Sequence, residues 1–192
     1  IVPGTKVKLQ GLILLSLLMD RKTYMIKKWR KDCFIETDYK LDPSFWDSYF
    51  TGEWQDSNQL YSEYVSNVTG GKEMNKFFVQ EIKNFDRPLL KLIKQLWNEF
   101  GIRPKDFRCN FFKVLEGGEL PAHIDAASKC SFLIPITENT GELYVEDNGE
   151  VESVVYDTLT VLNTRKSHGV KGPTKTRIVF HMGVHDVGFE QL

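Results

Sequence analysis

The amino-acid sequence predicts an α+β fold that is mainly β, with an antiparallel barrel or sandwich in the C-terminal half and helices packed against it. After Pro104, short runs rich in β-branched and aromatic residues alternate with Gly, Asn and Asp. Six or seven such runs without helices between them are typical of an antiparallel barrel or sandwich. The length of 192 residues suits one domain and is enough to bury a core without disulfides.

The segment 25–105 is expected to be mostly helical support for the barrel. Asp42, Pro43 and Ser44 form a typical helix start. Aromatic residues follow between positions 45 and 64, and we expect them to form core between helix and barrel, with a lid over a site as the alternative. The best-defined helix is expected over 86–100, because its apolar residues form a broad stripe, Pro88 lies near its start and Gly101 follows its end.

The expected barrel core covers residues 106–186 of a single domain that spans 25–192. Its predicted strands are Phe107–Leu115, Glu119–Ile124, Cys130–Ile136, Glu142–Val145, Ser153–Asn163, Gly169–Val170 and Thr176–Val184. Residues 1–24 are expected to be an extension that says nothing about function. Its apolar run 11–19 is about half the length of a membrane span and is followed directly by charged residues, so no membrane span is expected.

Charge and cysteine content narrow the function class. The formal net charge is −1, but residues 1–31 hold eight basic side chains against one acid (+7), and the rest hold 17 against 25 (−8). An acidic body argues against a nucleic-acid-binding protein. The three cysteines are an odd number without a CxxC pair, which argues against a disulfide framework or a cysteine-built zinc site and favours a cytoplasmic protein.

A candidate metal site begins with His123 and Asp125. Side chains two residues apart on a strand point to the same face, so this imidazole and this carboxylate can meet at one point. A second imidazole from another strand, His168, would complete a two-histidine, one-carboxylate set that leaves coordination positions open on Fe(II). The alternative is a surface histidine beside an aspartate in a turn. A site built from His181 and His185 has no obvious third ligand.

Arg177 is a second unusual residue, because it lies within the apolar, strand-like segment Thr176–Val184. An arginine in such a segment is costly unless it is paired. It could bind a carboxylate ligand through two parallel hydrogen bonds. The alternative is a salt bridge to an acid of the same chain, with Asp157 and Glu146 as candidates.

The segment Phe111–Asp125 resembles the start of the iron site in 2-oxoglutarate/Fe(II)-dependent oxygenases, particularly the prolyl 4-hydroxylase-like branch. Further along the chain, three segments and Arg177 match other parts of that family's pattern in the same order; the segments are Gly141–Val145, Asp157–Asn163 and Ser167–Val170. The match covers about 107–185. The segment 131–136 lacks the inward Arg and His expected of aspartyl β-hydroxylase relatives.

This resemblance implies a double-stranded β-helix, a jelly-roll or cupin-like barrel, that hydroxylates an unactivated C–H bond and releases succinate and CO₂. His123, Asp125 and His168 would hold Fe(II), and Arg177 would bind 2-oxoglutarate, with O₂ as co-substrate and ascorbate as a further cofactor that the family allows. The substrate would be a peptide, an amino acid or another small molecule.

Two positions depart from the family pattern, since Val114 and Val179 stand where the family often has hydroxyl side chains. The remaining hydrogen bonds to 2-oxoglutarate would then come from elsewhere, and the candidates are Ser131, Tyr144 and Asn163.

Other interpretations stay open. His181 shares a strand face with Arg177, so it could line the ligand pocket, although a packed histidine without a catalytic part is the expectation. The whole domain could also be a non-catalytic β-sandwich that binds a partner or ligand. A third interpretation is a cupin-like metalloenzyme that uses Zn or Mn without 2-oxoglutarate.

Overall fold

The computed structural model describes residues 25–61, 69, 72–138, 141–154 and 157–192. The predicted extension 1–24 therefore lies outside the described residues. In chain order the elements are β1 (Lys28–Arg30), β2 (Phe34–Thr37), η1 (Pro43–Tyr49), β3 (Gln55–Asp56), α2 (Ser57–Leu60), β4 (Asn75–Glu81), α4 (Arg87–Phe100), β5 (Phe107–His123), β6 (Cys130–Pro135), β7 (Glu142–Asp147), β8 (Glu150–Val154), β9 (Thr160–Leu162), β10 (Ser167–Lys171), β11 (Arg177–Val184) and η2 (Phe189–Gln191).

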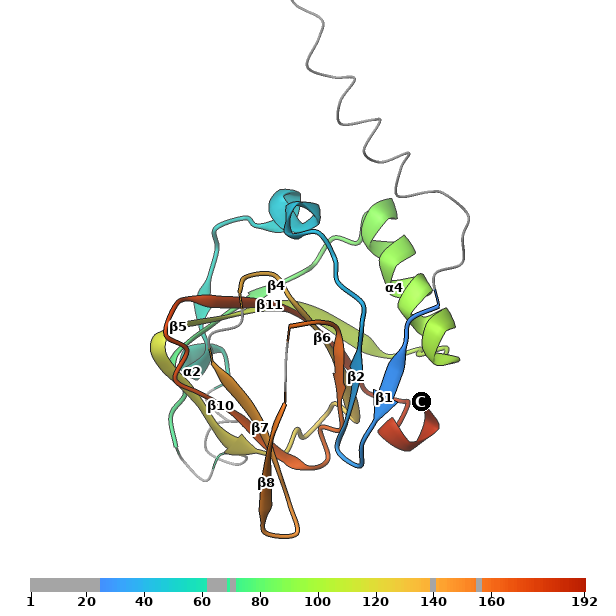
Figure 1. Ribbon diagram of the computed structural model, residues 1–192. Coiled ribbons are helices and arrows are strands. Elements are labelled where there is room, and N and C mark those ends of the chain that lie inside the picture. The colour runs from blue at the N-terminus through green and yellow to red at the C-terminus, as the bar shows by residue number, and fades with distance from the viewer. Residues whose placement is uncertain (1–24, 62–68, 70–71, 139–140, 155–156) are drawn as a thin grey trace, which may run out of the picture.

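The strands curve round a common axis into a barrel (Figure 1). The hydrogen-bonded order is β1-β2-β9-β6-β11-β5-β10-β7-β8, and β4 pairs with β5 and β3 with β4. Every one of these pairs is antiparallel. The predicted fold class, a mainly β double-stranded β-helix of the jelly-roll or cupin type, is confirmed.

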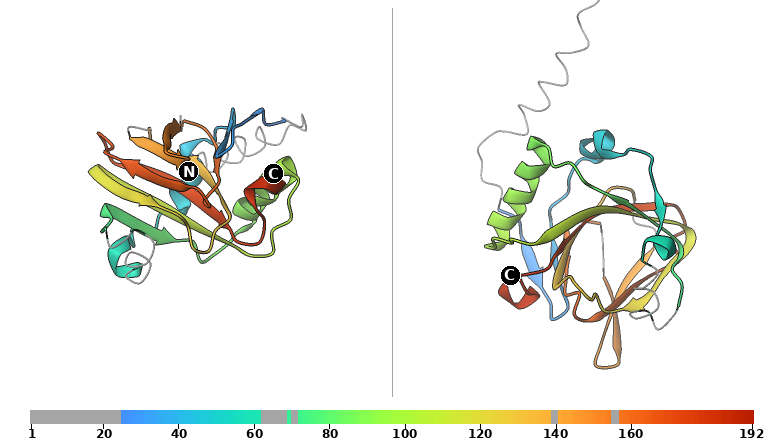
Figure 2. Two further views of the ribbon diagram at one scale, coloured as in Figure 1. Left: turned by 90° about the horizontal axis from the view of Figure 1, so that it is seen from below. Right: turned by 180° about the vertical axis from the view of Figure 1, so that it is seen from behind.

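Strand β5 belongs to both layers of the barrel. Its first half pairs with β11, where Phe107 lies opposite Val184 and Val114 opposite Arg177. Its last residues pair with β10, where His123 lies opposite His168. The layer β9-β6-β11-β5 therefore continues into the layer β5-β10-β7-β8 along a single strand, as the views in Figure 2 show.

The sequence predicted two strands here, Phe107–Leu115 and Glu119–Ile124, and the structure joins them. The backbone turns from one layer to the other at Gly117 and Gly118. Gly117 has φ +65°, a conformation that favours glycine, and a Cβ at Gly118 would lie 2.8 Å from the carbonyl oxygen of Leu115. Conversely, the predicted strand Ser153–Asn163 is divided into the end of β8 and the separate strand β9.

Helix α4 packs on the outside of the barrel (Figure 1). Its predicted limits are confirmed, because the Asp86 side chain accepts from the Leu89 N–H at one end and Gly101 takes the left-handed conformation at the other. The apolar stripe of the helix is buried against the outer face of the sheet, and Phe100 meets Phe132 with ring centroids 5.1 Å apart.

The aromatic residues after Asp42 also form core, as expected. Trp46 lies in η1 and is fully buried, with its ring stacked on Phe180 at 4.6 Å and edge-on to Phe111 at 5.5 Å. Residues 62–68, which contain Tyr64 of the predicted aromatic group, lie outside the described residues.

The segment 25–105 differs from the expectation of mostly helical support, because it contributes strands to the barrel itself. β2 pairs with β9, and β4 pairs with the first part of β5. Each of these strands contains one short apolar stretch. The alternation of apolar and polar residues in it is too brief to distinguish a strand from a helix by sequence. Within the part of the chain that the structure describes, none of the helices combines the length and apolar character that a membrane crossing requires.

Candidate metal centre

Two histidines face each other across neighbouring strands inside the barrel. His123 ends β5 and lies directly opposite His168 of β10 in the antiparallel ladder. The ring centroids are 4.3 Å apart, and each residue is 6% exposed. Gly169 follows His168 without room for a side chain, since a Cβ there would lie 2.4 Å from the Tyr144 hydroxyl. Close packing on the outer side of β10 therefore fixes the backbone that carries His168.

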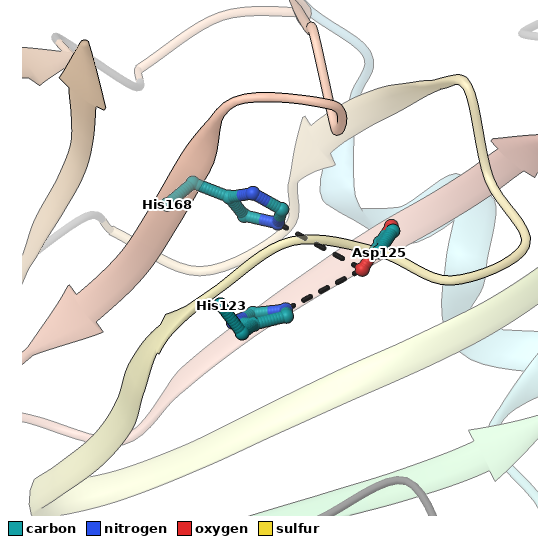
Figure 3. A group of neighbouring side chains, drawn as sticks. All are labelled: His123, Asp125 and His168. Atoms are coloured by element: carbon teal, nitrogen blue, oxygen red, sulfur yellow. Dashed lines mark ion pairs between the residues drawn. The ribbon is translucent and has the colours of Figure 1, made fainter. Parts of the chain in front are cut away.

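Asp125 completes the cluster from the loop that follows β5 (Figure 3). Its Oδ1 lies 3.4 Å from Nε2 of His123 and 3.9 Å from Nε2 of His168. The backbone holds this loop in place: the Asp125 N–H donates to the Thr164 carbonyl at 3.0 Å, and Nη1 of Arg165 donates to the Asp125 carbonyl at 3.2 Å. The carboxylate is thus tied to the turn that leads into β10.

Both imidazoles are oriented by backbone carbonyls. Nδ1 of His123 lies 2.9 Å from the Pro121 carbonyl oxygen, and Nδ1 of His168 lies 2.9 Å from the Lys166 carbonyl oxygen. A carbonyl oxygen only accepts, so each Nδ1 carries the proton and donates. In the neutral rings Nε2 is then left as the atom with a free lone pair, which is the arrangement that protein metal sites use.

The electrostatics of the cluster favour a cation at its centre. Burial lowers the pKa of His168 to about 4, assisted by His123 and opposed by Asp125. Burial alone would raise the pKa of Asp125, but the interactions with His123 and His168 outweigh it and hold that pKa below its usual range. At neutral pH the Asp125 carboxylate and the lone pair of the neutral His168 ring therefore point to one place, where a cation would be stabilised.

The donor set fits a single metal ion. One ligand atom from each of His123, Asp125 and His168 can be chosen so that all lie within 4.8 Å of one another. Two atoms bound to one ion at about 2.1 Å each lie up to about 4 Å apart, so only small movements would bring all three to it. Among the described residues no other group of this kind is found. The arrangement predicted from the sequence, two histidines and one carboxylate at one point, is present.

The cluster lies in a cavity of about 310 Å³ inside the barrel. Alternate residues of β11 line this cavity, from Arg177 through Val179 and His181 to Gly183. Arg177 is 3% exposed, so its guanidinium belongs to the barrel interior. Of the two acids considered as its partners, Asp157 is exposed and Glu146 accepts a hydrogen bond from the Ser167 hydroxyl.

Ser131 and His181 form a polar pair in the cavity wall. Nε2 of His181 lies 3.0 Å from the Ser131 hydroxyl, and its ring stacks on Phe112 with centroids 4.4 Å apart. Burial lowers the pKa of His181 to about 4. His181 is therefore packed, as expected, and also lines the cavity. His185 instead pairs with Asp106 at 3.2 Å near the end of β11.

Two of the residues considered for 2-oxoglutarate are not brought to the cavity. Tyr144 lies opposite Gly169 on the outer face of β7, where Lys171 covers its ring, while its neighbours Leu143 and Val145 point inward. The Asn163 side chain accepts from the backbone N–H of Arg165 and so closes the turn before β10. Strand alternation and turn geometry thus direct both side chains elsewhere.

Sequence reasoning missed four polar residues of the cavity, namely Arg108, Asn110, Ser128 and Thr164. The first two lie at alternate positions of β5, on the face that points into the barrel. Counting back in steps of two from Val114, through Phe112, would have identified them. Tyr61 follows the short helix α2 and belongs to the aromatic group for which a lid over a site was the alternative to core; it lines the cavity.

Comparison with known proteins finds no matching family model and no matching curated protein. Solved structures do match. An oxidoreductase of the 2OG-Fe(II) oxygenase family from Burkholderia pseudomallei is 18% identical, covers 59% of this chain and 71% of its own, and has a TM-score of 0.46. A prolyl hydroxylase from Trichoplax adhaerens, in complex with a hypoxia inducible factor peptide fragment, is 16% identical over 68% of this chain and 76% of its own, with a TM-score of 0.47.

Cupin structures match as well. A cupin 2 conserved barrel domain protein from Rhodopseudomonas palustris is 13% identical, covers 60% of this chain and 64% of its own, and has a TM-score of 0.39. These likenesses are too distant to assign an activity, so the function is inferred from the residues of this chain.

Proposed function

We propose that this protein is a dioxygenase that depends on Fe(II) and 2-oxoglutarate and hydroxylates an unactivated C–H bond of a peptidyl or amino-acid substrate. The observation that carries the proposal is the cluster of His123, Asp125 and His168, in which the Nε2 atoms of both histidines lie within 4 Å of one carboxylate oxygen inside a barrel cavity. Prolyl 4-hydroxylase-like enzymes are the branch that the sequence resembles.

The ligand set favours Fe(II) over most other metals. Two imidazoles and one carboxylate on one face of an ion leave three octahedral positions open, and this set is typical of non-haem iron oxygenases. When bound, the iron would supply the activation of O₂ that oxidises a C–H bond while 2-oxoglutarate is converted to succinate and CO₂. Ascorbate would serve as a reductant for the metal.

The chain's own contribution is to hold the ligands ready. The carbonyl oxygens of Pro121 and Lys166 keep both imidazoles in the tautomer that offers Nε2. The tie between the Asp125 N–H and the Thr164 carbonyl keeps the carboxylate between the two rings. No large rearrangement is therefore needed when a metal binds, which reduces the free-energy cost of binding.

Arg177 would bind the distal carboxylate of 2-oxoglutarate. Its guanidinium lies in the barrel interior, and the wall around it is apolar, formed by residues that include Val114 and Val179. A planar guanidinium forms two parallel hydrogen bonds to a carboxylate, and in an apolar wall this pair selects both charge and orientation. Ser131 and His181 line the same cavity and would supply further hydrogen bonds to 2-oxoglutarate.

The three cysteines are buried and free, as is usual in a reducing compartment, and we place the protein in the cytoplasm.

An anaerobic titration with Fe(II) and 2-oxoglutarate tests the proposal. We expect a weak visible absorption band from the iron–keto-acid chelate, and no band in Asp125→Ala, which removes the carboxylate ligand. Under O₂ the loaded protein should form succinate. A protein that binds Zn or Mn but gives no band with iron and 2-oxoglutarate would be a cupin-like metalloenzyme, and one that binds no metal would be a non-catalytic binding module.

Arg177→Gln tests the cosubstrate site separately from the metal. Loss of a charge-assisted pair to a carboxylate costs roughly 1.5–3 kcal/mol, so the 2-oxoglutarate concentration that gives half the band should rise at least about tenfold. Iron binding should stay unchanged, because no metal ligand is altered. An unchanged 2-oxoglutarate requirement would remove Arg177 from this role.

A further inference from the structure

A second arginine faces the barrel interior at the start of strand β5. Arg108 lines the cavity together with Asn110, Phe112 and Val114, so it shares the inner face of the strand with them. Unlike Arg177, Arg108 is exposed to solvent. The cavity thus has a buried cation at one end and a solvent-accessible cation at the other.

The backbones of the two arginines lie far apart along the sheet. In the ladder between β5 and β11, Arg177 lies opposite Val114 and Gly183 lies opposite Arg108. Six residues of strand separate Val114 from Arg108, which is about 20 Å. A 2-oxoglutarate bound close to Arg177 would therefore lie well away from the backbone of Arg108. If Arg177 binds the cosubstrate, Arg108 is left for another anion.

Arg108 lies close to the loop that follows Asp125. Its partner Gly183 has no side chain, and a Cβ there would lie 2.6 Å from the Ser128 hydroxyl of the loop after Asp125. Tyr61, Arg108 and Asp125 all line the same cavity, which places the guanidinium and the metal cluster in one space. Ile124, between the two ligands of that loop, is 48% exposed and adds an apolar surface.

Among the described residues, none of the acids nearest this end forms an ion pair with Arg108. Asp106 pairs with His185, and Asp186 accepts hydrogen bonds from the backbone N–H groups of Lys105 and Asp106. Glu81 lies on the neighbouring strand opposite Asn110. Among the residues that the structure describes, the side chain of Arg108 has neither a hydrogen bond nor an ion pair. On a protein whose body is acidic, this is an available positive charge at a cavity mouth.

We propose that Arg108 forms a carboxylate-binding subsite for the primary substrate, so that the enzyme acts on a molecule whose carboxylate lies some distance from the carbon that is oxidised. This proposal rests on the function proposed above and adds the substrate class to it. The carboxylate can belong to a small molecule or to an acidic residue of a peptide. In both cases it binds the guanidinium of Arg108 while Tyr61 and Ile124 contact the apolar part next to it.

Anaerobic isothermal titration calorimetry on the full-length protein loaded with Fe(II) and 2-oxoglutarate tests this subsite. The probes are matched pairs: N-acetyl amino acids against their primary amides, and pentapeptides with one central Asp against the same peptides with Asn. At least one acid should bind about tenfold or more tightly than its neutral partner. The first set reports a small-molecule carboxylate and the second a peptide side chain. If no acid in either set is preferred, the subsite does not exist.

Variants connect the preference to this residue. Arg108→Gln should remove the preference for acids, and Arg108→Lys should keep part of it, because the charge stays but the planar fork is lost. Arg103→Gln is the matched control, since it removes the same charge from an exposed position five residues away that does not line the cavity. An equal loss in Arg103→Gln would mean that overall charge, and not a subsite, causes the preference.

The two proposals fail in different ways. If the iron–keto-acid band forms normally but Arg108→Gln binds acids as the unaltered protein does, the subsite is wrong and the oxygenase stands. If the band does not form, the oxygenase is wrong. If Arg108→Gln raises the 2-oxoglutarate requirement as much as Arg177→Gln does, Arg108 contacts the cosubstrate and the subsite proposal is overturned.

Discussion

The two faces of strands β5 and β11 differ in what they bury. On the outer face, Phe111 and Phe180 pack with Trp46 and the helix α4 in a continuous apolar core. On the inner face, the same strands present Asn110, His181 and Arg177 to a cavity. Alternate residues of one strand thus serve either the stability of the fold or the chemistry of the site.

This difference separates two requirements that often conflict. Polar side chains inside a barrel are costly unless they are paired or hold a ligand. Here the outer layer can supply the stability that the inner face lacks, because α4 and η1 cover the sheet on that side (Figure 1). Variants on the two faces should accordingly differ in whether they change folding or ligand binding.

The largest loss of stability is expected for Trp46→Ala on the outer side. This side chain is fully buried and contacts the rings of Phe111 and Phe180. Removal of a buried tryptophan leaves a cavity and costs about 3–5 kcal/mol of the free energy of unfolding. Urea denaturation followed by circular dichroism measures this. A change below about 1 kcal/mol would mean that η1 is not part of the cooperative core.

An intermediate effect, limited to acid, is expected for His181→Phe on the inner face. The pKa of His181 is about 4 in the folded protein and about 6.5 when unfolded. The unfolded chain then binds more protons between these values, so stability is complete above pH 6.5 and falls as the pH drops toward 4. The shifted pKa of His181 accounts for a loss of up to about 3 kcal/mol in the free energy of unfolding at acid pH, and the Phe variant should lack this loss. Urea denaturation between pH 7 and 4.5 gives the free energy of unfolding of both proteins, and the difference between them should change as the pH falls. A constant difference would contradict a lowered pKa for His181.

The smallest change in stability is expected for Asp125→Ala, although it should abolish metal binding. The carboxylate lies between two imidazoles at the end of the cavity and packs against no part of the outer core. We expect the free energy of unfolding of the metal-free protein to fall less than in Trp46→Ala, because no apolar core is removed. Isothermal titration with Fe(II) checks the first result and urea denaturation the second. A variant that unfolds would show that the cluster is a folding element.

Much of the fold could be predicted because local signals agreed with it. The helix 86–100 carries an N-cap aspartate, a proline and a terminal glycine, so its limits were confirmed. His123, Asp125 and His168 lie together because β5 and β10 are neighbouring strands. That these two distant strands pair was expected from the family resemblance and not from a local sequence pattern.

The rest depended on tertiary structure. β4 and β2 are strands because they extend an existing sheet, and nothing in their short sequences requires it. Tyr144 has the right chemistry for a ligand contact, but its position in β7 puts it on the outer face. Arg108 has no special local context and becomes visible only when the inward period of β5 is known.

The continuity of β5 makes the barrel a single mechanical unit. One unbroken strand holds hydrogen bonds to β11 in one layer and to β10 in the other. A local opening that frees His168 from its ladder therefore also disturbs the strand that pairs with Arg177. Amide protons of β10 and β11 should therefore exchange with deuterated solvent in one shared event.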